Sequence, residues 1–253
     1  MSSPSRETAA IVLDSRNHGE SDKIVTFFST DIGKMTGIAK GANRSKKRFL
    51  NKLELFSHIT LYYSENRRST LYFISDAELA FSFIHLRSNI TFYNAATFVR
   101  EILLIATTEG EGDPRLFNLL HWALHSLDCG KPPLGILTIF LLRLLEHIGY
   151  RPDLDNCHGC GSPFSLEQQY NFSHTGGGLI CSRCQATAPG SDTILSVGTI
   201  RLLRSALAEP LDRLHRLQFS RRAVGQALPT LQRYSRNLFQ REIHSWKAIQ
   251  KML

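Results

Sequence analysis

Residues 7–40, ETAAIVLDSRNHGESDKIVTFFSTDIGKMTGIAK, decide the fold of the first part of the chain. Short runs rich in Ile, Val, Thr and Phe are separated there by turn-forming residues, which is typical of β-strands. The expected strands are residues 7–14, 23–30, 33–40, 54–65 and 69–79. Five short strands at this spacing predict a small closed barrel, because closure removes exposed sheet edges. We expect an OB-type barrel over residues 1–82, with an SH3-like barrel as the alternative.

Residues 37–52, GIAKGANRSKKRFLNK, contain six Lys or Arg and no acid. They can form a solvated loop, a targeting signal or a surface for a polyanion. Their place after a predicted barrel strand favours nucleic acid, because small barrels present grooves to single strands. Bases there would neutralise phosphates without reading sequence, so binding should weaken steeply with salt. The predicted contacts are Lys40, Arg44, Lys46, Lys47, Arg48, Lys52, Arg67 and Arg68.

Aromatic residues on the neighbouring strands can supply stacking surfaces for bases. The candidates are Tyr62, Tyr63, Tyr72 and Phe73. Side chains alternate between the two faces of a strand, so only about half of these can face outward and the others belong to the core.

After about residue 85 the apolar period becomes helical. Asp113-Pro114 and Pro132-Pro133 each begin a helix, and the second of these helices is apolar nearly all round, which predicts a central position. Further helices are expected at 196–208, capped by Ser196, and at 222–252, kinked or started by Pro229. The predicted architecture is α+β multi-domain, with an α-helical domain over 83–253 interrupted by a metal module at 153–190.

Two Cys-x-x-Cys pairs are the strongest local signal in the chain. CHGC supplies Cys157 and Cys160, and CSRC supplies Cys181 and Cys184. A glycine-tipped hairpin over 168–180 would bring the pairs together around one structural Zn²⁺ with no open coordination position. Disulfides and a redox pair are the alternatives, disfavoured because nothing indicates an oxidising compartment or a thioredoxin-like context.

Other candidate ligands and thiols receive simpler interpretations. His158 and His174 are near enough in sequence to replace a cysteine ligand, but with four cysteines present we expect them to be bystanders. Cys129 stands alone and is expected to be a small buried hydrophobe.

Signals for an enzyme are weak. Gly33-Lys34 fails as a phosphate-binding loop because Phe28 and Met35 occupy required positions, and neither HExxH nor GxSxG occurs. Loop carboxylates could bind Mg²⁺ as in a nuclease, but solvated turn residues are the favoured interpretation. Those carboxylates are Asp14, Glu20, Asp22 and Asp31. We expect no enzyme, with a Mg-dependent nuclease or a pure protein-interaction scaffold as alternatives.

The net charge of +8 is unevenly distributed. Residues 40–52 contribute +6, residues 201–253 contribute another +8 from eleven bases and three acids, and the remainder is therefore about −6. Two basic patches on an acidic body suggest a polyanionic partner. On the last predicted helix a solvated face is the default, and a second DNA or partner contact is the alternative. The bases concerned are Arg222, Arg233, Arg236, Lys247 and Lys251.

The first residues lack the layout of a signal peptide, and the longest apolar run is broken by Arg143. We therefore expect a soluble, cytoplasmic protein.

The chain resembles the RecO family of bacterial recombination mediators. The N-terminal pattern is an Arg, then Gly-Glu-x-Asp, then a Gly-Lys strand, then Lys-Gly-Ala-x-Arg-Ser-Lys. Here these positions are Arg16, Gly19, Glu20, Asp22, Gly33, Lys34, Lys40, Gly41, Ala42, Arg44, Ser45 and Lys46. Segments 77–87, 146–161, 176–184 and 231–253 are similar to later parts of the family pattern.

The resemblance implies an OB fold, a helical domain and a zinc module, although some members lack the cysteines. It also implies binding of single- and double-stranded DNA, annealing of complementary strands, and action with RecR to load RecA onto strands coated with single-stranded-DNA-binding protein (SSB). The acidic, apolar-ended SSB tail is expected on the helical domain, and the protein is expected in the cytoplasm with the nucleoid.

Overall fold

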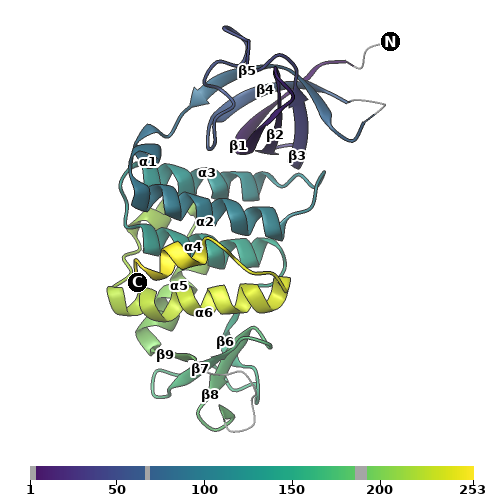
Figure 1. The fold of residues 1–253 in the computed structure, drawn as a ribbon. Coiled ribbons are helices and arrows are strands. Elements are labelled where there is room, and N and C mark those ends of the chain that lie inside the picture. Colours follow the sequence, from purple (N-terminus) through teal and green to yellow (C-terminus); the bar gives the residue numbers. More distant parts are fainter. Residues whose placement is uncertain (1–3, 66–68, 186–192) are drawn as a thin grey trace. The chain divides into compact units, whose positions relative to one another are not determined.

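A computed structural model describes residues 4–65, 69–185 and 193–253 (Figure 1). The chain forms two compact units. The first combines Met1–Ile84 with Thr107–Leu124, and the second combines His85–Ala106 with His125–Leu253. The domain limits expected from the sequence, 1–82 and 83–253, divide the chain into two consecutive parts and remain a prediction. They do not anticipate that residues 107–124 belong to the same compact unit as the barrel.

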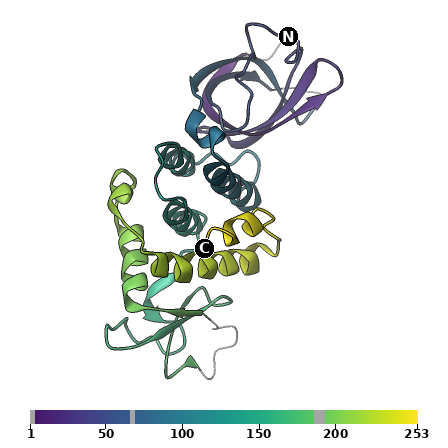
Figure 2. The same cartoon turned by 60° about the vertical axis from the view of Figure 1, so that its left-hand side comes forward.

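The first unit is built on a closed five-stranded barrel, as predicted (Figure 1, Figure 2). Its strands are β1 (Arg6–His18), β2 (Asp22–Ser29), β3 (Gly33–Ala39), β4 (His58–Ser64) and β5 (Tyr72–Phe81). The order around the barrel is β1-β2-β3-β5-β4, in which β3 and β5 are parallel and the other pairs are antiparallel. This is the OB-type arrangement.

Alternation of buried and half-buried positions along the strands builds the barrel core. On β4, Ile59, Leu61 and Tyr63 point inward and are buried, with half-buried residues between them. Gly37 on β3 pairs with β5, and a Cβ there would lie only 2.6 Å from the Ile74 side chain. A glycine is therefore required for the parallel pair that closes the barrel.

The connection between helices α2 (Ile90–Ala106) and α3 (Pro114–Asp128) packs against the start of β3. Gly110 N donates to Lys34 O at 3.1 Å, and the Lys34 ammonium donates to Thr107 O. A Cβ on Gly33 would lie 2.1 Å from Glu111 O, and a Cβ on Gly112 would lie 2.0 Å from the carbonyl oxygen of Asp31. Gly33 and Lys34 therefore hold this connection, which explains the Gly-Lys pair structurally.

The second unit is mainly helical. Across the chain the helices are α1 (Ile84–Ser88), α2 (Ile90–Ala106), α3 (Pro114–Asp128), α4 (Pro133–His147), α5 (Val197–Ala208), the 3-10 helix η2 (Leu211–Arg216), α6 (Arg221–Phe239) and α7 (Trp246–Gln250). Helix α4 contacts α2, α5 and α6, and most of its residues are buried, which confirms its central position. Ser196 caps α5 by accepting from Thr199 N at 3.3 Å. Figure 2 shows α5 crossing α6.

The single helix expected over 222–252 is wrong. Helix α6 begins at Arg221, continues through Pro229 and ends at Phe239, where Gln240 adopts a left-handed conformation with φ 51°. The chain then turns before α7 begins at Trp246. Pro229 neither starts nor ends the helix. Within the described ranges, no helix is both long and apolar enough to cross a membrane.

A four-stranded sheet interrupts the helices. Its strands are β6 (Asp153–Cys157), β7 (Tyr170–Ser173), β8 (Gly178–Cys181) and β9 (Thr193–Leu195), in the order β6-β8-β7-β9. Strands β7 and β8 form the predicted antiparallel hairpin.

Replacing Gly112 by Ala is expected to destabilise the protein by about 3 kcal/mol, because the new methyl group overlaps the backbone carbonyl of Asp31. Gly110→Ala is the matched control, since Gly110 has φ +83° but nothing within 4 Å of a built Cβ, and should cost about 1 kcal/mol. Equilibrium unfolding in denaturant measures both values. Equal costs would contradict the close approach.

Candidate metal centre and nucleic-acid interface

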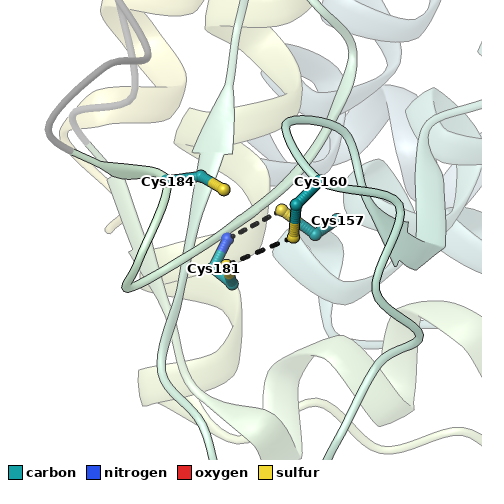
Figure 3. Close-up of side chains that lie close together, drawn as sticks. All are labelled: Cys157, Cys160, Cys181 and Cys184. Atoms are coloured by element: carbon teal, nitrogen blue, oxygen red, sulfur yellow. Dashed lines mark hydrogen bonds between the residues drawn. The ribbon is translucent and has the colours of Figure 1, made fainter.

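The four predicted cysteine ligands lie together in the second unit (Figure 3). Their sulfur atoms all lie within 4.8 Å of one another, and Cys160 Sγ is 3.8 Å from Cys181 Sγ. A tetrahedron of sulfurs around an ion at about 2.3 Å has edges of about 3.8 Å. A disulfide needs about 2.05 Å, and all five cysteines are free. The cluster can therefore hold a metal ion.

Two tight turns aim the sulfurs inward. Gly161 N donates to Cys157 O at 2.8 Å in the first turn, and Cys184 N donates to Cys181 O at 3.0 Å in the second. Cys181 N also donates to Cys157 Sγ at 3.3 Å, which links the two turns (Figure 3). Such N–H···S contacts are typical support for thiolates.

The electrostatics of the cluster favour a cation. Hydrogen bonds from the side chain and backbone of Ser162 lower the pKa of the Cys160 thiol to about 6. Hydrogen bonds with Cys160 and Cys181 raise the pKa of Cys184 to about 12. One thiol of the cluster therefore has a lowered pKa and another a raised pKa, because their hydrogen-bond partners differ. A bound divalent cation removes the repulsion between adjacent sulfur anions and stabilises all four thiolates.

The sheet that carries the cysteines packs on α5 and α6. Tyr234 on α6 donates to Tyr150 O at 3.3 Å and packs edge-on against Phe172, with ring centroids 5.8 Å apart. Arg204 on α5 pairs with Asp155 at 2.8 Å. These contacts couple the metal module to the helices, so the module supports the unit that surrounds it.

Neither histidine joins the cysteine cluster. His158 is exposed, and His174 is buried, with its Nε2 3.3 Å from Thr193 Oγ1. The expectation for Cys129 is wrong, because Cys129 is exposed. It follows the last residue of α3, where the helix end places it at the surface, and its sulfur is 3.6 Å from His125 Nε2.

The basic stretch forms an ordered connection between β3 and β4. Ala42, Phe49 and Leu53 belong to the buried barrel core and anchor it. At its start, the Asp22 carboxylate accepts from Gly41 N at 2.8 Å. Gly41 has φ +70°, which favours glycine. The hydrogen bond from Gly41 is the largest of the effects that lower the pKa of Asp22, so this carboxylate is a structural anchor.

The six bases of this connection divide by role. Arg48 donates to Ser75 O and Lys40 O, and Lys52 donates to Ala77 O at 2.6 Å, so both hold the connection to the barrel. Arg44 pairs with Glu20 at 3.2 Å. The side chains of Lys40, Lys46 and Lys47 are exposed and form no ion pair with the part of the chain that the structure describes. These three are the bases best placed for a phosphate.

The aromatic candidates differ in exposure. Tyr63 is only 3% exposed and packs edge-on against Tyr72, with centroids 5.6 Å apart. Tyr62 and Phe73 are half-buried. Partial burial and the nearby carboxylates of Glu78, Glu7 and Asp76 raise the pKa of Tyr62. That acidic surrounding makes Tyr62 a poor platform for DNA. Arg67 and Arg68 lie outside the described residues.

The loop carboxylates do not converge on one ion. Asp22 begins β2, and Asp31 follows its other end. At about 3.3 Å per residue the two lie more than about 20 Å apart along the strand. Among residues 4–65, 69–185 and 193–253, the cysteine cluster is the only group of three or more His, Cys, Asp or Glu that could hold a metal. The nuclease alternative thus gains no support.

The C-terminal bases lie on two helices instead of one. Arg222, Arg233 and Arg236 are exposed and share a face of α6, since their spacings of 11 and 3 residues are close to whole turns. Arg236 pairs with Glu242 at 2.7 Å. Lys247 on α7 and Lys251 beyond it are exposed after the turn, so the predicted stripe is broken at Gln240.

Sequence reasoning missed two adjoining hollows in the second unit. They measure about 370 and 490 Å³, and both are lined by Pro132, Gly135 and Phe219. Lys131 lies at the first and Arg221 at the second. The Pro-Pro pair that begins α4 marked a helix start but gave no sign of a groove, because Phe219 comes from a distant segment.

The chain is therefore a multidomain protein of a definite class. It joins an OB-type barrel that carries a basic connection to a helical unit that contains four clustered cysteines. The profile described as "Recombination protein O N terminal" matches residues 1–83, and that described as "Recombination protein O C terminal" matches residues 87–247. The chain belongs to the RecO family.

Curated relatives extend this similarity over nearly the whole chain. A protein of Syntrophobacter fumaroxidans named "DNA repair protein RecO" is 33% identical over 249 residues, which cover 96% of each chain. The protein of that name from Syntrophus aciditrophicus is 30% identical over 97% of this chain and 95% of its own. The one from Rubrobacter xylanophilus is 36% identical over 79% and 80%.

Cys160→Ser should lower the metal bound by the purified protein well below one ion per chain, because a serine hydroxyl is a poor ligand for a thiolate-binding metal. It should also lower the thermal unfolding midpoint. Cys129→Ser is the control, since Cys129 is exposed and outside the cluster. Elemental analysis checks both variants. Unchanged metal content in Cys160→Ser would contradict the site.

Proposed function

We propose that this protein is a non-enzymatic, DNA-binding recombination mediator that acts in recombinational repair. Its relatives carry the name "DNA repair protein RecO". The observation that carries the proposal is the connection between β3 and β4, where Lys40, Lys46 and Lys47 are exposed on a segment anchored in the barrel core. A rigid base and unpaired ammonium groups bind phosphates with little loss of conformational entropy.

The proposed mechanism is charge neutralisation. Bound lysines cancel the repulsion between two phosphate backbones and hold complementary strands together until they pair, without nucleotide hydrolysis. Single- and double-stranded DNA both bind, because phosphates are common to both. Arg48 and Lys52 contribute indirectly by holding the connection to β5 through Ser75 O and Ala77 O. Arg44 contributes once DNA competes with Glu20 for it.

We assign Zn²⁺ to the four cysteines. Four thiolates at tetrahedral spacing match the preferred ligands of zinc and leave no position for substrate, so the ion is structural. Its role is to hold the β6–β9 sheet against α5 and α6.

The partners proposed are RecR, the RecA pathway and SSB. The groove formed by the two adjoining hollows is the proposed docking place for the SSB tail. Its lining is mainly apolar, with Phe219 shared by both hollows, and it includes the bases Lys131 and Arg221. That combination complements an acidic peptide with an apolar end. Arg222 adds another base on α6, whereas Arg233, Arg236, Lys247 and Lys251 remain candidates for a second DNA contact.

Reversing the charge of Lys46 and Lys47 together, as Lys46→Glu and Lys47→Glu, should weaken binding of single-stranded DNA about tenfold or more at low salt. The slope of log affinity against log salt should fall by about 1.4, because about 0.7 is lost per phosphate contact. The charge-matched control is Arg201→Glu with Arg241→Glu, two exposed bases outside the connection. Fluorescence anisotropy measures the affinities, and unchanged affinity would contradict the assignment.

The same variants separate the mediator from a protein scaffold. The wild-type protein and the control pair should accelerate annealing of complementary SSB-coated strands, and the double Lys variant should not. A scaffold would leave annealing insensitive to both pairs of substitutions while still capturing partner proteins.

Lys131→Glu should weaken binding of an SSB-tail peptide several-fold, because it places an acid in the lining of the groove. The control variant is Arg241→Glu, and the control peptide lacks its apolar end. Isothermal titration calorimetry measures binding, and equal affinity for Lys131→Glu and wild type would contradict the docking place.

A further inference from the structure

The connection between β3 and β4 contains a small hollow that the phosphate contacts do not use. It measures about 170 Å³, well below the roughly 300–1,000 Å³ of pockets for drug-sized ligands. Its lining includes Asn43, Ser45, Leu50, Asn51 and Glu54 of the connection together with Lys23 of β2. All of these residues belong to the first unit.

The walls of the hollow suit a neutral, planar ligand with donors and acceptors. Lys23 and Glu54 pair with each other at 3.5 Å and so offer no net charge. The side-chain amides of Asn43 and Asn51 form no hydrogen bond with the residues that the structure describes, and both residues are exposed. An amide can donate and accept, as the edges of nucleobases require.

Leu50 supplies an apolar surface at the same place. Its side chain is 58% exposed, although both Phe49 and Leu53 nearby are buried in the barrel core. An exposed leucine side chain among these polar lining residues can pack against the face of a base. Within this stretch the leucine follows the lysines proposed to bind phosphate, so a nucleotide could place its phosphate on Lys46 or Lys47 and its base in the hollow.

The hollow is preformed. Ser45 Oγ accepts from Arg48 N at 3.0 Å and from Phe49 N at 3.4 Å, which fixes the turn that carries Lys46 and Lys47. Asn43 N donates to Ser21 O at 2.9 Å, which fixes the backbone at another lining residue. Little ordering is needed when a ligand enters, so a small contact area can still contribute to affinity.

We propose that this hollow holds one unpaired nucleobase of a single DNA strand. The proposal rests on the proposed DNA-binding function and deepens it. A base inside a duplex is stacked and paired and does not enter, whereas an unpaired base does. The hollow therefore makes the connection favour single strands, while the lysines serve both forms, and pairing with a complementary strand withdraws the base.

The test compares two oligomers of equal length at equal salt: an oligodeoxynucleotide and an abasic sugar-phosphate strand. A base contact of about 1 kcal/mol or more predicts that the wild-type protein binds the first at least about fivefold more tightly. In Leu50→Ala with Asn51→Gly this preference should disappear while the salt dependence remains. Glycine is the replacement at Asn51 because φ is 58° there. Asn43→Ala removes the other side-chain amide of the lining, and by itself it should reduce the preference for the oligodeoxynucleotide.

Leu79→Ala is the control, because Leu79 is an exposed leucine of the same barrel that does not line the hollow. Lys46→Glu with Lys47→Glu should weaken both oligomers alike. Equal wild-type affinity for the two oligomers overturns the base site and leaves phosphate binding intact. Binding of neither oligomer at low salt overturns the proposed function as well. Variants of the hollow that keep the full preference, or that lose both oligomers equally, also overturn the site.

Discussion

Closure of the barrel through the parallel pairing of β3 with β5 sets the conditions for the rest of the first unit. Gly37 permits this pairing because any side chain there would overlap Ile74. Once β5 lies beside β3, β4 can pair only with β1 and β5, so the chain must cross from β3 to β4 by a long connection. Residues 40–57 form that crossing. Ala42, Phe49 and Leu53 of this segment enter the barrel core, whereas Lys40, Lys46 and Lys47 remain exposed, so the crossing presents a basic surface.

The bases of this connection perform different tasks. Arg48 and Lys52 satisfy carbonyl groups of β5 and fix the crossing, Arg44 is neutralised by Glu20, and Lys40, Lys46 and Lys47 stay exposed. A charge count alone treats them as equal. Some bases of such a cluster hold the segment in place and do not bind a ligand. Guanidinium and ammonium groups are strong donors to backbone carbonyls as well as ligands for anions. Fewer bases are therefore available to bind an anion than a charge count suggests.

The cysteine cluster applies a comparable constraint in the second unit. Four ionised sulfurs within 4.8 Å of one another would repel each other, so a bound cation would stabilise this arrangement of the β6–β9 sheet. Tyr234 on α6 packs against Phe172 and Arg204 on α5 pairs with Asp155, so this sheet is joined directly to both helices. The groove at Phe219 belongs to the same helical unit, yet its lining comes from the helices, the residues that flank them and the C-terminal residues Met252 and Leu253, with no residue of the β6–β9 sheet.

The sequence by itself determined the strands, the central α4 and the four cysteines that cluster, since local periodicity and Cys-x-x-Cys spacing are short-range properties. It also located the basic stretch. Only the tertiary structure decided what depends on contacts between distant segments. It placed Gly112 against Asp31, separated structural from exposed bases, put Tyr62 among carboxylates, left Cys129 at the surface and ended α6 at Phe239. The hollow at Asn43 and Asn51 and the groove at Phe219 were invisible for the same reason, because a concave surface exists only once separate segments have packed together.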